Sequence, residues 1–319
     1  MPTAETIAIS GETGPGMELT QTHKSRKRDA YWDNLVQGET AQYKVKALDA
    51  LIAAHGPSKV DGLLDIGCGT SEIALHYLDA LGGRRLVGLD YDAAVVEAAA
   101  RRYGDPRLEW RQADIFELGR SADRFDLVFM LDMLHEVYSF CGRPNGDVAE
   151  PIDHALGLDA ARRALAQVAT VVAPGGAVAI TDNVLCPDDV RVTVRVLNAQ
   201  ARGAVGRFLD EYPARRMAHR WAGADTLEIG SHDLCILLTQ YNKLKQADPA
   251  RWNVEKLEIH QYMTVAEYRD CFGDLGFTLH ATVGTPPDAG AEWTADFRME
   301  SGLPGLPDKR ITLLAVKAG

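Results

Sequence analysis

The sequence predicts an α/β fold in which a doubly wound, mostly parallel sheet lies between helices. Short apolar segments that are typical of buried strands recur along the first half of the chain, and amphipathic helical patterns alternate with them. Several of these strands end in a carboxylate, and a glycine-rich turn joins the first of them to its helix. Such an alternation predicts parallel strands joined by helices, with any ligand at the carboxyl ends of the strands.

The first strand is predicted at 63–66 and carries Asp65 near its end. Gly67 and Gly69 then turn the chain into a helix predicted at 72–81, whose apolar stripe stops at a glycine pair. A glycine-rich turn at a helix N-terminus lets a ligand approach backbone amides that have no partner in the helix. Because Asp65 places an anion beside that turn, the pattern favours a ligand with an ammonium group over a diphosphate.

The second strand, predicted at 85–90, ends in another carboxylate, Asp90. An acid at this point is placed to bridge both ribose hydroxyls of an adenosine-containing cofactor. The next elements keep the same alternation. We expect helices at 93–103 and 158–172 and strands at 108–113, 125–131 and 177–182.

This order of motifs resembles the class I S-adenosylmethionine-dependent methyltransferases, in particular those of the small-molecule type. Residues 65–69 resemble the cofactor loop of the family, and Asp90 matches its ribose-binding acid. Asp114 and Ile115 stand where the family clamps adenine, and the segment 131–136 resembles the one that opens into its active site. Several motifs in the right order and spacing identify a family far better than any one of them alone.

The similarity covers about residues 40–185 and resumes at 264–318. It implies S-adenosylmethionine as the cofactor and a seven-stranded, mostly parallel sheet whose last strand is antiparallel. We expect that strand at 310–317 and its neighbour at 277–283, with a capping box at 264–267 that opens the preceding helix. The cofactor residues that the resemblance implies are Asp65, Gly67, Cys68, Gly69, Asp90, Tyr91, Asp114, Ile115, Leu131 and Asp132.

Two other functions fit parts of the pattern. A Rossmann domain that binds a nicotinamide dinucleotide needs a third glycine for tight packing of helix on strand, and this chain has Glu72 at that position. A glutamate in the first turn would also repel a pyrophosphate. The second alternative is a non-catalytic regulatory protein that keeps the cofactor site, because a fold alone does not establish a function.

The amino-acid composition argues against several classes of protein. A chain of 319 residues with 46% hydrophobic residues is long enough for one decorated α/β domain with a large core. The net charge of -11 argues against a general nucleic-acid binder. The five cysteines are scattered and predict neither a disulfide framework nor a zinc site. Without a long apolar run or an apolar leader, we expect a cytoplasmic protein that has no membrane partner.

Two departures from the minimal family core stand out. One is the long loop at 139–154, which follows the fourth strand and is expected at the mouth of the site. The other is the stretch 187–262, in which helical patterns at 190–207, 215–222 and 231–246 predict a cap over a substrate pocket and a surface for a homodimer. The expected segments are a mobile tail at 1–20, N-terminal helices and the cofactor-binding core at 21–186, a helical cap insertion at 187–262, and the rest of the core at 263–319.

The region before the first strand has two interpretations. A basic run at 23–28 fits the start of a solvated helix. Alternatively, Tyr31, Trp32 and Tyr43 belong to a lid over the cofactor, as in many relatives of this family. The helix directly before the first strand is expected at 44–55.

Methyl transfer from a sulfonium is an in-line displacement, so the protein mainly aligns donor and acceptor and excludes water. His135 is the first candidate for a general base, since imidazole titrates near neutral pH; the alternative is a histidine that walls the cofactor pocket. Tyr138 is a candidate donor to the acceptor or else a core tyrosine. Glu136 is expected to point away from the site, because adjacent helical residues are about 100° apart.

We expect no metal, because the histidines of the cap region show no metal-binding spacing; those considered are His219, His232 and His260. Arg191, Arg195 and Arg202 recur at helical spacing and predict either a solvated face or a clamp for a carboxylate or phosphate. The sequence therefore predicts a methyltransferase that acts on a small molecule of specialised metabolism, with an anionic acceptor as one option and no nucleic-acid partner. It does not reveal whether oxygen, nitrogen, carbon or sulfur is methylated.

Overall fold

The computed structural model describes residues 39–246 and 249–319. The expected tail at 1–20 and the aromatic residues Tyr31 and Trp32 lie outside the described residues. A seven-stranded sheet forms the centre of the described chain, in the order β3-β2-β1-β4-β5-β11-β9. Its strands are β1 Gly62–Ile66, β2 Arg85–Asp90, β3 Leu108–Gln112, β4 Phe125–Leu131, β5 Val172–Asn183, β9 Phe277–Gly284 and β11 Arg310–Lys317.

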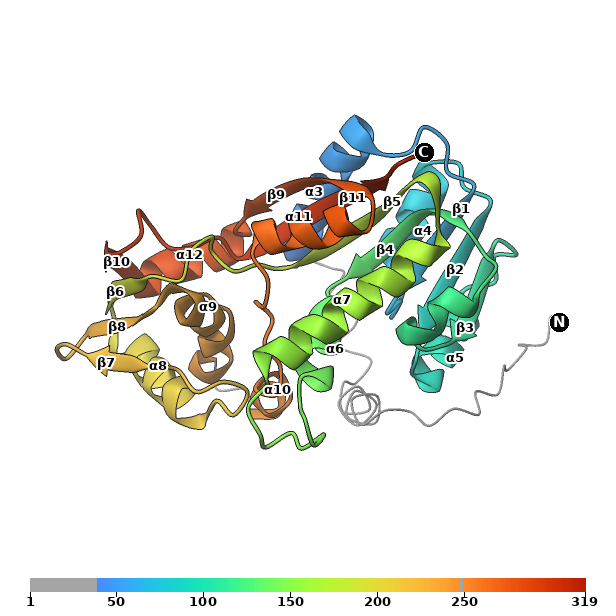
Figure 1. The fold of residues 1–319 in the computed structure, drawn as a ribbon. Helices are drawn as coiled ribbons and strands as arrows, with labels where there is room; N and C mark the ends of the chain where they lie inside the picture. The colour runs from blue at the N-terminus through green and yellow to red at the C-terminus, as the bar shows by residue number, and fades with distance from the viewer. Residues whose placement is uncertain (1–38, 247–248) are drawn as a thin grey trace.

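The direction of these strands confirms the fold class that the sequence predicts. β1 pairs in parallel with β2 and β4, and β4 pairs in parallel with β5. β11 is antiparallel to both of its neighbours, β5 and β9. Figure 1 shows α7 and α11 crossing one face of this sheet. The helices of this part are α3 Glu39–His55, α4 Glu72–Ala80, α5 Ala93–Arg102, α6 Leu134–Cys141, α7 His154–Val171 and α11 Val265–Asp274, with a 3-10 helix, η1, at Ile115–Arg120.

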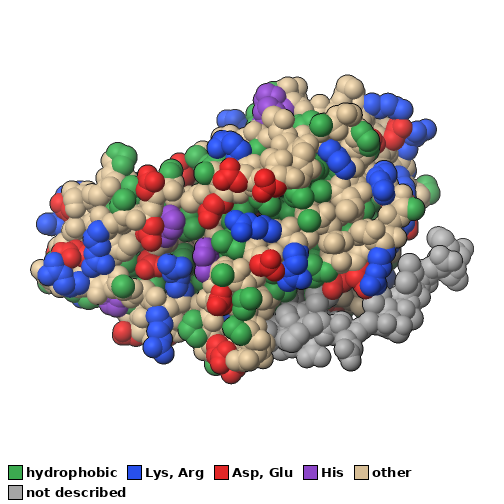
Figure 2. All heavy atoms as spheres, in the orientation of Figure 1, with side chains coloured by type: hydrophobic (Ala, Val, Ile, Leu, Met, Phe, Trp, Pro, Cys, Tyr) green, Lys and Arg blue, Asp and Glu red, His purple; other side chains and the backbone are tan. Residues whose placement is uncertain are grey.

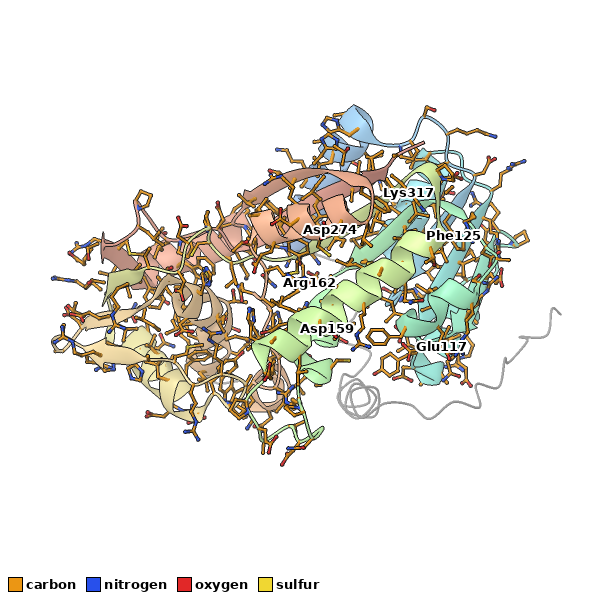
Figure 3. The ribbon with its side chains drawn as sticks, in the orientation of Figure 1. Glu117, Phe125, Asp159, Arg162, Asp274 and Lys317 are labelled. Atoms are coloured by element: carbon orange, nitrogen blue, oxygen red, sulfur yellow. The ribbon has the colours of Figure 1, made fainter. Side chains whose placement is uncertain are left out.

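The inner strands are nearly continuous apolar runs because helices cover the sheet on both faces. Successive side chains of a strand point to opposite faces, so Leu63 packs with the buried residues of α3 and α4. Leu64, one residue on, packs with the buried residues of α7. At one end of α7, Lys317 of β11 donates to the carbonyls of Ala169 and Val172, at 2.7 and 2.9 Å (Figure 3). A cation at this position also complements the helix dipole.

The segment between β5 and α11 is not the helical cap that the sequence predicts. It contains three helices, but also three strands that form a second, four-stranded sheet with a later strand, in the order β10-β6-β8-β7. In Figure 1 this insertion lies to one side of the large sheet. Its elements are β6 Arg191–Val196, α8 Ala199–Glu211, β7 His219–Trp221, β8 Thr226–Gly230, α9 Ser231–Lys245 and α10 Pro249–Glu255, joined by α12 Pro287–Asp296 and β10 Phe297–Ser301.

The prediction of a helix at 190–207 is therefore wrong in its first half, where β6 lies. β6 alternates arginine or threonine with valine, and Val192, Val194 and Val196 are buried while the residues between them are not. Alternation with β-branched residues is the pattern of a half-buried strand. Arg191 and Arg195 lie on this strand rather than on one helical face with Arg202, so the shared helical face was wrong as well.

The expected helix at 215–222 is also wrong, because β7 lies there, whereas α9 fits the expectation at 231–246 closely. No helix among the described residues is long and apolar enough to cross a membrane. On the face shown in Figure 2, acidic and basic side chains are interspersed over the whole surface. This face therefore carries mixed charges rather than a single basic patch.

Candidate cofactor and acceptor site

The glycine-rich turn after β1 is wound tightly against the segment after β4. Gly67 and Gly69 have φ values of +68° and +49°, which favour glycine because a side chain clashes there. A Cβ on Gly67 would also lie 2.9 Å from Cβ of Met133. Glycine at position 67 therefore lets the turn pack closely against Met133.

Asp65 is a buried carboxylate at the edge of this space. It accepts a hydrogen bond from Oγ of Ser71, at 2.6 Å. Burial raises the pKa of Asp65 to about 7, and the nearby Asp90 acts in the same direction, while the bond from Ser71 opposes them. A bound cation would favour the charged form of this carboxyl. The turn is thus suited to a positively charged group, as the sequence predicts.

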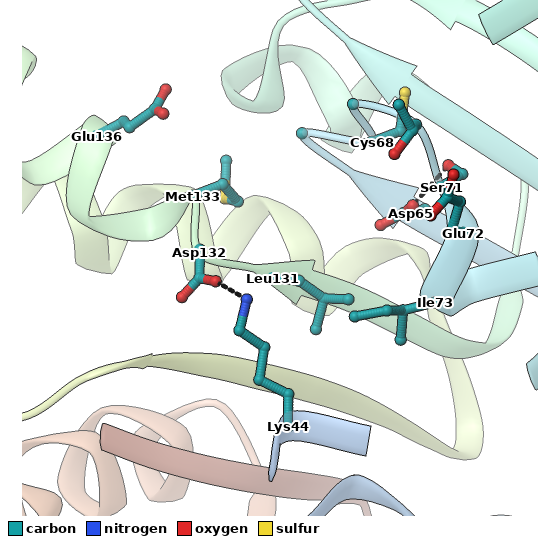
Figure 4. Close-up of a pocket in the computed structure, with 13 residues that line it drawn as sticks. Lys44, Asp65, Cys68, Ser71, Glu72, Ile73, Leu131, Asp132, Met133 and Glu136 are labelled. Carbon is teal, nitrogen blue, oxygen red and sulfur yellow. Dashed lines mark hydrogen bonds and ion pairs between the residues drawn. The ribbon is translucent and has the colours of Figure 1, made fainter. Parts of the chain in front are cut away.

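A cavity of about 640 Å³, partly open to solvent, borders this turn. Figure 4 shows Asp65, Cys68 and Ser71 on one side of it and Asp132 and Met133 across from them. The residues that line it are Lys44, Asp65, Gly67, Cys68, Gly69, Thr70, Ser71, Glu72, Ile73, Leu131, Asp132, Met133 and Glu136.

Asp132 closes one wall of this cavity in an unusual conformation. Its φ is +54°, in the left-handed region, and its carboxylate pairs with Lys44 of α3 and Arg310 of β11. Burial would raise the pKa of Asp132, but Arg310 and Lys44 together hold it well below its usual value. A carboxylate that is engaged by two cations is a poor proton acceptor. Asp132 is therefore placed to shape the site rather than to act as a base.

A second cavity, of about 470 Å³, adjoins the first. Both are lined by Gly67, Met133 and Glu136, so they meet at the glycine turn. The complete lining of the second is Ile66, Gly67, Leu89, Asp90, Tyr91, Ala113, Asp114, Ile115, Phe116, Met133, Glu136, Val137 and Cys141. An elongated ligand could thus extend from Asp65 to Asp114.

The acids of the second cavity are held in place by the backbone. Asp90 is buried and accepts from the amide of Asp92, at 3.0 Å. Asp114 begins η1 and accepts from the amide of Phe116, at 2.9 Å. Burial raises the pKa of Asp114. Asp90 ends β2 and Asp114 lies just beyond β3 of the same sheet, which explains why residues far apart in sequence border one cavity.

All ten cofactor residues that the resemblance implies line one of these two cavities. Their individual contacts with a cofactor stay predictions. Lys44 and Glu136 also line the first cavity and were missed. Glu136 was expected to point away, and this was wrong: periodicity gives the angle between neighbouring residues of α6 but not which of them faces the cavity.

His135 borders neither cavity and faces the insertion instead. Its Nδ1 lies 2.8 Å from Oδ1 of Asp182, and its Nε2 lies 3.5 Å from Oε2 of Glu258. Burial opposes the charged imidazolium, but Asp182 and Glu258 raise the pKa of His135 well above its usual value. Both ring nitrogens of His135 are engaged by buried carboxylates, so this geometry does not favour the role of general base.

Tyr138 lies in the core beneath the cavities. Its ring stacks on Tyr262 with centroids 4.8 Å apart, and its Oη lies 2.9 Å from Nδ1 of His154. It borders neither cavity. Of the two interpretations of this residue, the geometry favours the core tyrosine.

Residues 63–140 match the model of a methyltransferase domain family. Over these residues the chain is similar to a methyltransferase domain, and its sheet has the class I methyltransferase fold. No curated protein matches this chain by sequence. The cofactor of the family is S-adenosylmethionine, and a buried acid beside a glycine turn with a second acid after β2 fits its ammonium group and its ribose.

Two solved structures show the same fold in this family. One is the plantazolicin methyltransferase BamL in complex with a triazolic desmethylPZN analog and SAH, with 10% identity and a TM-score of 0.50 over 96% of this chain and 96% of that chain. The other is the 1,6-didemethyltoxoflavin-N1-methyltransferase of Burkholderia thailandensis with bound 1,6-didemethyltoxoflavin and S-adenosylhomocysteine, with 14% identity and a TM-score of 0.50 over 98% and 94%.

Proposed function

We propose that this methyltransferase transfers a methyl group from S-adenosylmethionine to a small molecule of specialised metabolism. The pair of joined cavities carries the proposal. One cavity has a buried acid at a glycine turn, and the other has the acids that follow β2 and β3. This arrangement suits a ligand with a cationic amino-acid end and an adenosine end.

When bound, S-adenosylmethionine supplies a methyl group on a sulfonium. The part of the protein is to bind, orient and exclude water. In this proposal Asp65 and the amides of the glycine turn hold the amino-acid end. Asp90 binds the ribose, and Asp114 and Ile115 lie at the edge of the adenine. Leu131 and Asp132 then line the side on which the acceptor binds.

The nature of the acceptor is proposed from what surrounds the first cavity. The insertion follows directly from the carboxyl end of β5, where ligands of doubly wound sheets bind. The structures of the plantazolicin and didemethyltoxoflavin methyltransferases hold small acceptor molecules or analogs. This likeness in fold supports a small molecule rather than a protein or nucleic acid as the acceptor.

An anionic acceptor remains part of the proposal, but it is supported by other residues than the arginines that the sequence indicated. Arg195 is half-exposed and pairs with Glu300, and Nε of Arg202 donates to the carbonyl of Ala224, so both serve the insertion itself. Lys44 instead lines the first cavity, and Arg310 shares the lining residue Asp132 with Lys44. A homodimer and a cytoplasmic location stay predictions from the sequence.

The test measures which class of molecule receives the methyl group. The purified chain is incubated with methyl-labelled S-adenosylmethionine and an extract of the cells that make it, and label is measured separately in small molecules, protein and nucleic acid. We expect label in the small-molecule fraction, and much less of it when Asp90→Ala replaces the wild-type chain. Label in protein or nucleic acid would refute the substrate class. Tight cofactor binding without transfer to any fraction would indicate the regulatory protein instead.

A further inference from the structure

Three potential metal ligands converge where α6 meets the chain after α10. They are His135, Glu258 and His260, and one ligand atom from each lies within 4.8 Å of the other two. Within residues 39–246 and 249–319 this is the one group of histidine, cysteine and acidic side chains with that geometry. Nε2 of His135 and Nε2 of His260 lie 3.5 and 3.3 Å from the same atom, Oε2 of Glu258.

The outer nitrogens of both imidazoles are oriented by adjacent residues of β5. Nδ1 of His135 lies 2.8 Å from Oδ1 of Asp182, and Nδ1 of His260 lies 3.5 Å from Nδ2 of Asn183. Asn183 is 3% exposed, and its Oδ1 has no hydrogen-bond partner among the described residues. Since the two ends of an amide have the same shape, turning it points Oδ1 at His260, where it can accept from Nδ1–H.

This arrangement is the one that metal-binding histidines adopt. Such histidines donate one ring N–H to a carboxylate or carbonyl, and this fixes the other nitrogen as the ligand. Here Asp182 and Asn183 would hold both Nδ1–H groups, leaving both Nε2 atoms directed toward Glu258. The two rings are stacked, with centroids 4.4 Å apart and planes within 16°.

The surrounding charges favour a cation between the rings. Asp182, Glu255 and Glu258 are all buried carboxylates. Lys243 pairs with Glu255 at 3.1 Å, whereas Arg143 donates to backbone carbonyls, among them that of Leu257 at 2.7 Å. Two protonated imidazoles stacked face to face would repel each other. A divalent ion supplies the same charge without that repulsion.

We propose that His135, Glu258 and His260 bind a divalent transition-metal ion of the zinc type. Two imidazoles and one carboxylate are a ligand set that zinc accepts. Glu255, whose Oε2 lies 3.1 Å from Nε2 of His260, pairs with Lys243 through the same oxygen and stays outside the set. Because these ligands border neither cavity, the ion fixes the chain after α10 against α6 and takes no part in methyl transfer. The inference is independent of the proposed function.

The experiment measures zinc binding to the full chain. The protein is stripped with a chelator, and Zn²⁺ is titrated against a competing indicator dye. We expect one ion per chain. Glu258→Gln and His260→Gln should weaken its binding by at least about tenfold. The matched control is His219→Gln, an exposed histidine of β7, which should bind as the wild type does. Zinc should also raise the melting temperature of the wild type and leave that of His260→Gln unchanged.

Two results would overturn the inference. One is a wild-type chain that takes up no stoichiometric zinc, a result that needs no variant to fold. The other is zinc uptake that survives in both Glu258→Gln and His260→Gln but is lost in Cys186→Ser, which would place the ion at the buried pair Cys186 and Cys235. Binding of S-adenosylhomocysteine, measured in parallel by calorimetry, keeps failure of this site distinct from failure of the cofactor site.

Discussion

Two aspartates at the ends of adjacent strands have opposite electrostatic environments. Among the described residues, Asp65 of β1 has Ser71 as its hydrogen-bond donor and no cation beside it, and burial raises its pKa to about 7. Asp132 follows β4 and lies between Lys44 and Arg310, which hold its pKa well below the usual value. Within the described part of the chain, Asp65 thus has no positively charged partner, whereas Asp132 already has two. A cationic ligand should therefore act through Asp65.

The affinity for S-adenosylhomocysteine should depend on pH through Asp65. The raised pKa means that the free protein holds a proton on Asp65 below about pH 7. Binding an ammonium group then requires that proton to leave, so affinity should fall by up to about tenfold per pH unit below 7 and level off above it. Calorimetry from pH 5.5 to 8 measures the slope.

Two variants isolate this effect. Asp65→Asn should bind weakly and with a much smaller slope, whereas Asp79→Asn, at an exposed acid of α4, should behave as the wild type does. An equal slope in Asp65→Asn would show that another group titrates. The raised pKa of Asp65 also makes the stability of the fold depend on pH. The stabilisation that comes from protonated Asp65 is fully present below the ordinary pKa of an aspartate, and it is lost as pH rises through about 7.

Asp90→Ala should weaken binding of S-adenosylhomocysteine by about 1.5–3 kcal/mol, the scale of a hydrogen bond to a charged group. Asp90 is buried and lines the second cavity, so its loss removes an acceptor that water does not readily replace. Asp79→Ala is the matched control. Calorimetry that finds the same affinity in both variants would remove Asp90 from the site.

His135→Ala distinguishes the two roles of that histidine. A general base would lower kcat by about 10²–10⁴-fold and leave cofactor affinity intact. The buried contacts with Asp182 and Glu258 lead us to expect a different result: a free energy of unfolding lower by about 3–5 kcal/mol, because two buried carboxylates lose their partner. Urea unfolding and turnover are measured together, with His219→Ala as the exposed control. A stable variant with lost turnover would restore the role of base.

At the scale of elements, the core strands could be predicted almost to the residue and the second sheet could not. β4 and β11 lie where the sequence places them, because a strand buried on both faces is a short apolar run bounded by turns. β6 pairs with β10 from far along the chain, so its stability depends on a partner that no local pattern reveals. Its two arginines, four residues apart, fit a helical spacing as well as a strand.

The same distinction applies to the site. The ten cofactor residues belong to motifs within short segments and could be found from the sequence. Lys44 could not, because α3 reaches Asp132 only through packing. Glu258 and His260 were missed as partners of His135 for the same reason, since more than a hundred positions separate them from it in the sequence.

Phe297→Ala tests whether the second sheet is needed for stability. Phe297 of β10 is 2% exposed and packs edge-on against Tyr241, with ring centroids 4.9 Å apart. Truncating a buried phenylalanine leaves a cavity and should lower the free energy of unfolding by about 3–5 kcal/mol. Leu197→Ala, at a residue that is 43% exposed, should change it by less than about 0.5 kcal/mol. Similar urea midpoints for the two variants would mean that β10 is not needed there.

For the whole molecule, the insertion and the large sheet share one apolar core. A single cluster of buried residues includes Val128 of β4, Phe208 of α8 and Leu237 of α9. Between the two parts, the amide of Ile259 donates to Oγ of Ser139, at 2.9 Å. The insertion is therefore continuous with the core rather than tethered to it.

Hydrogen exchange should reflect this continuity. The amides of α9 should be protected as strongly as those of β4, because most residues of α9 are buried. Adding S-adenosylhomocysteine should increase protection at 67–71 and 113–116 and leave α9 unchanged. Rapid exchange of α9 with and without ligand would mean that the insertion is not a stable part of the fold.

β11 hydrogen-bonds to β5 on one side and to β9 on the other, yet residues 310–317 leave the ribosome after both of those strands. Among the described strands, β9 pairs with β11 alone. During translation, β9 therefore has no strand to pair with until β11 has been made. Over the same period, the edge of β5 that β11 covers in the folded protein stays unpaired. Unpaired strand edges are templates for association between chains. A chain that is released shortly before position 310 would keep both edges open and should therefore be prone to aggregate.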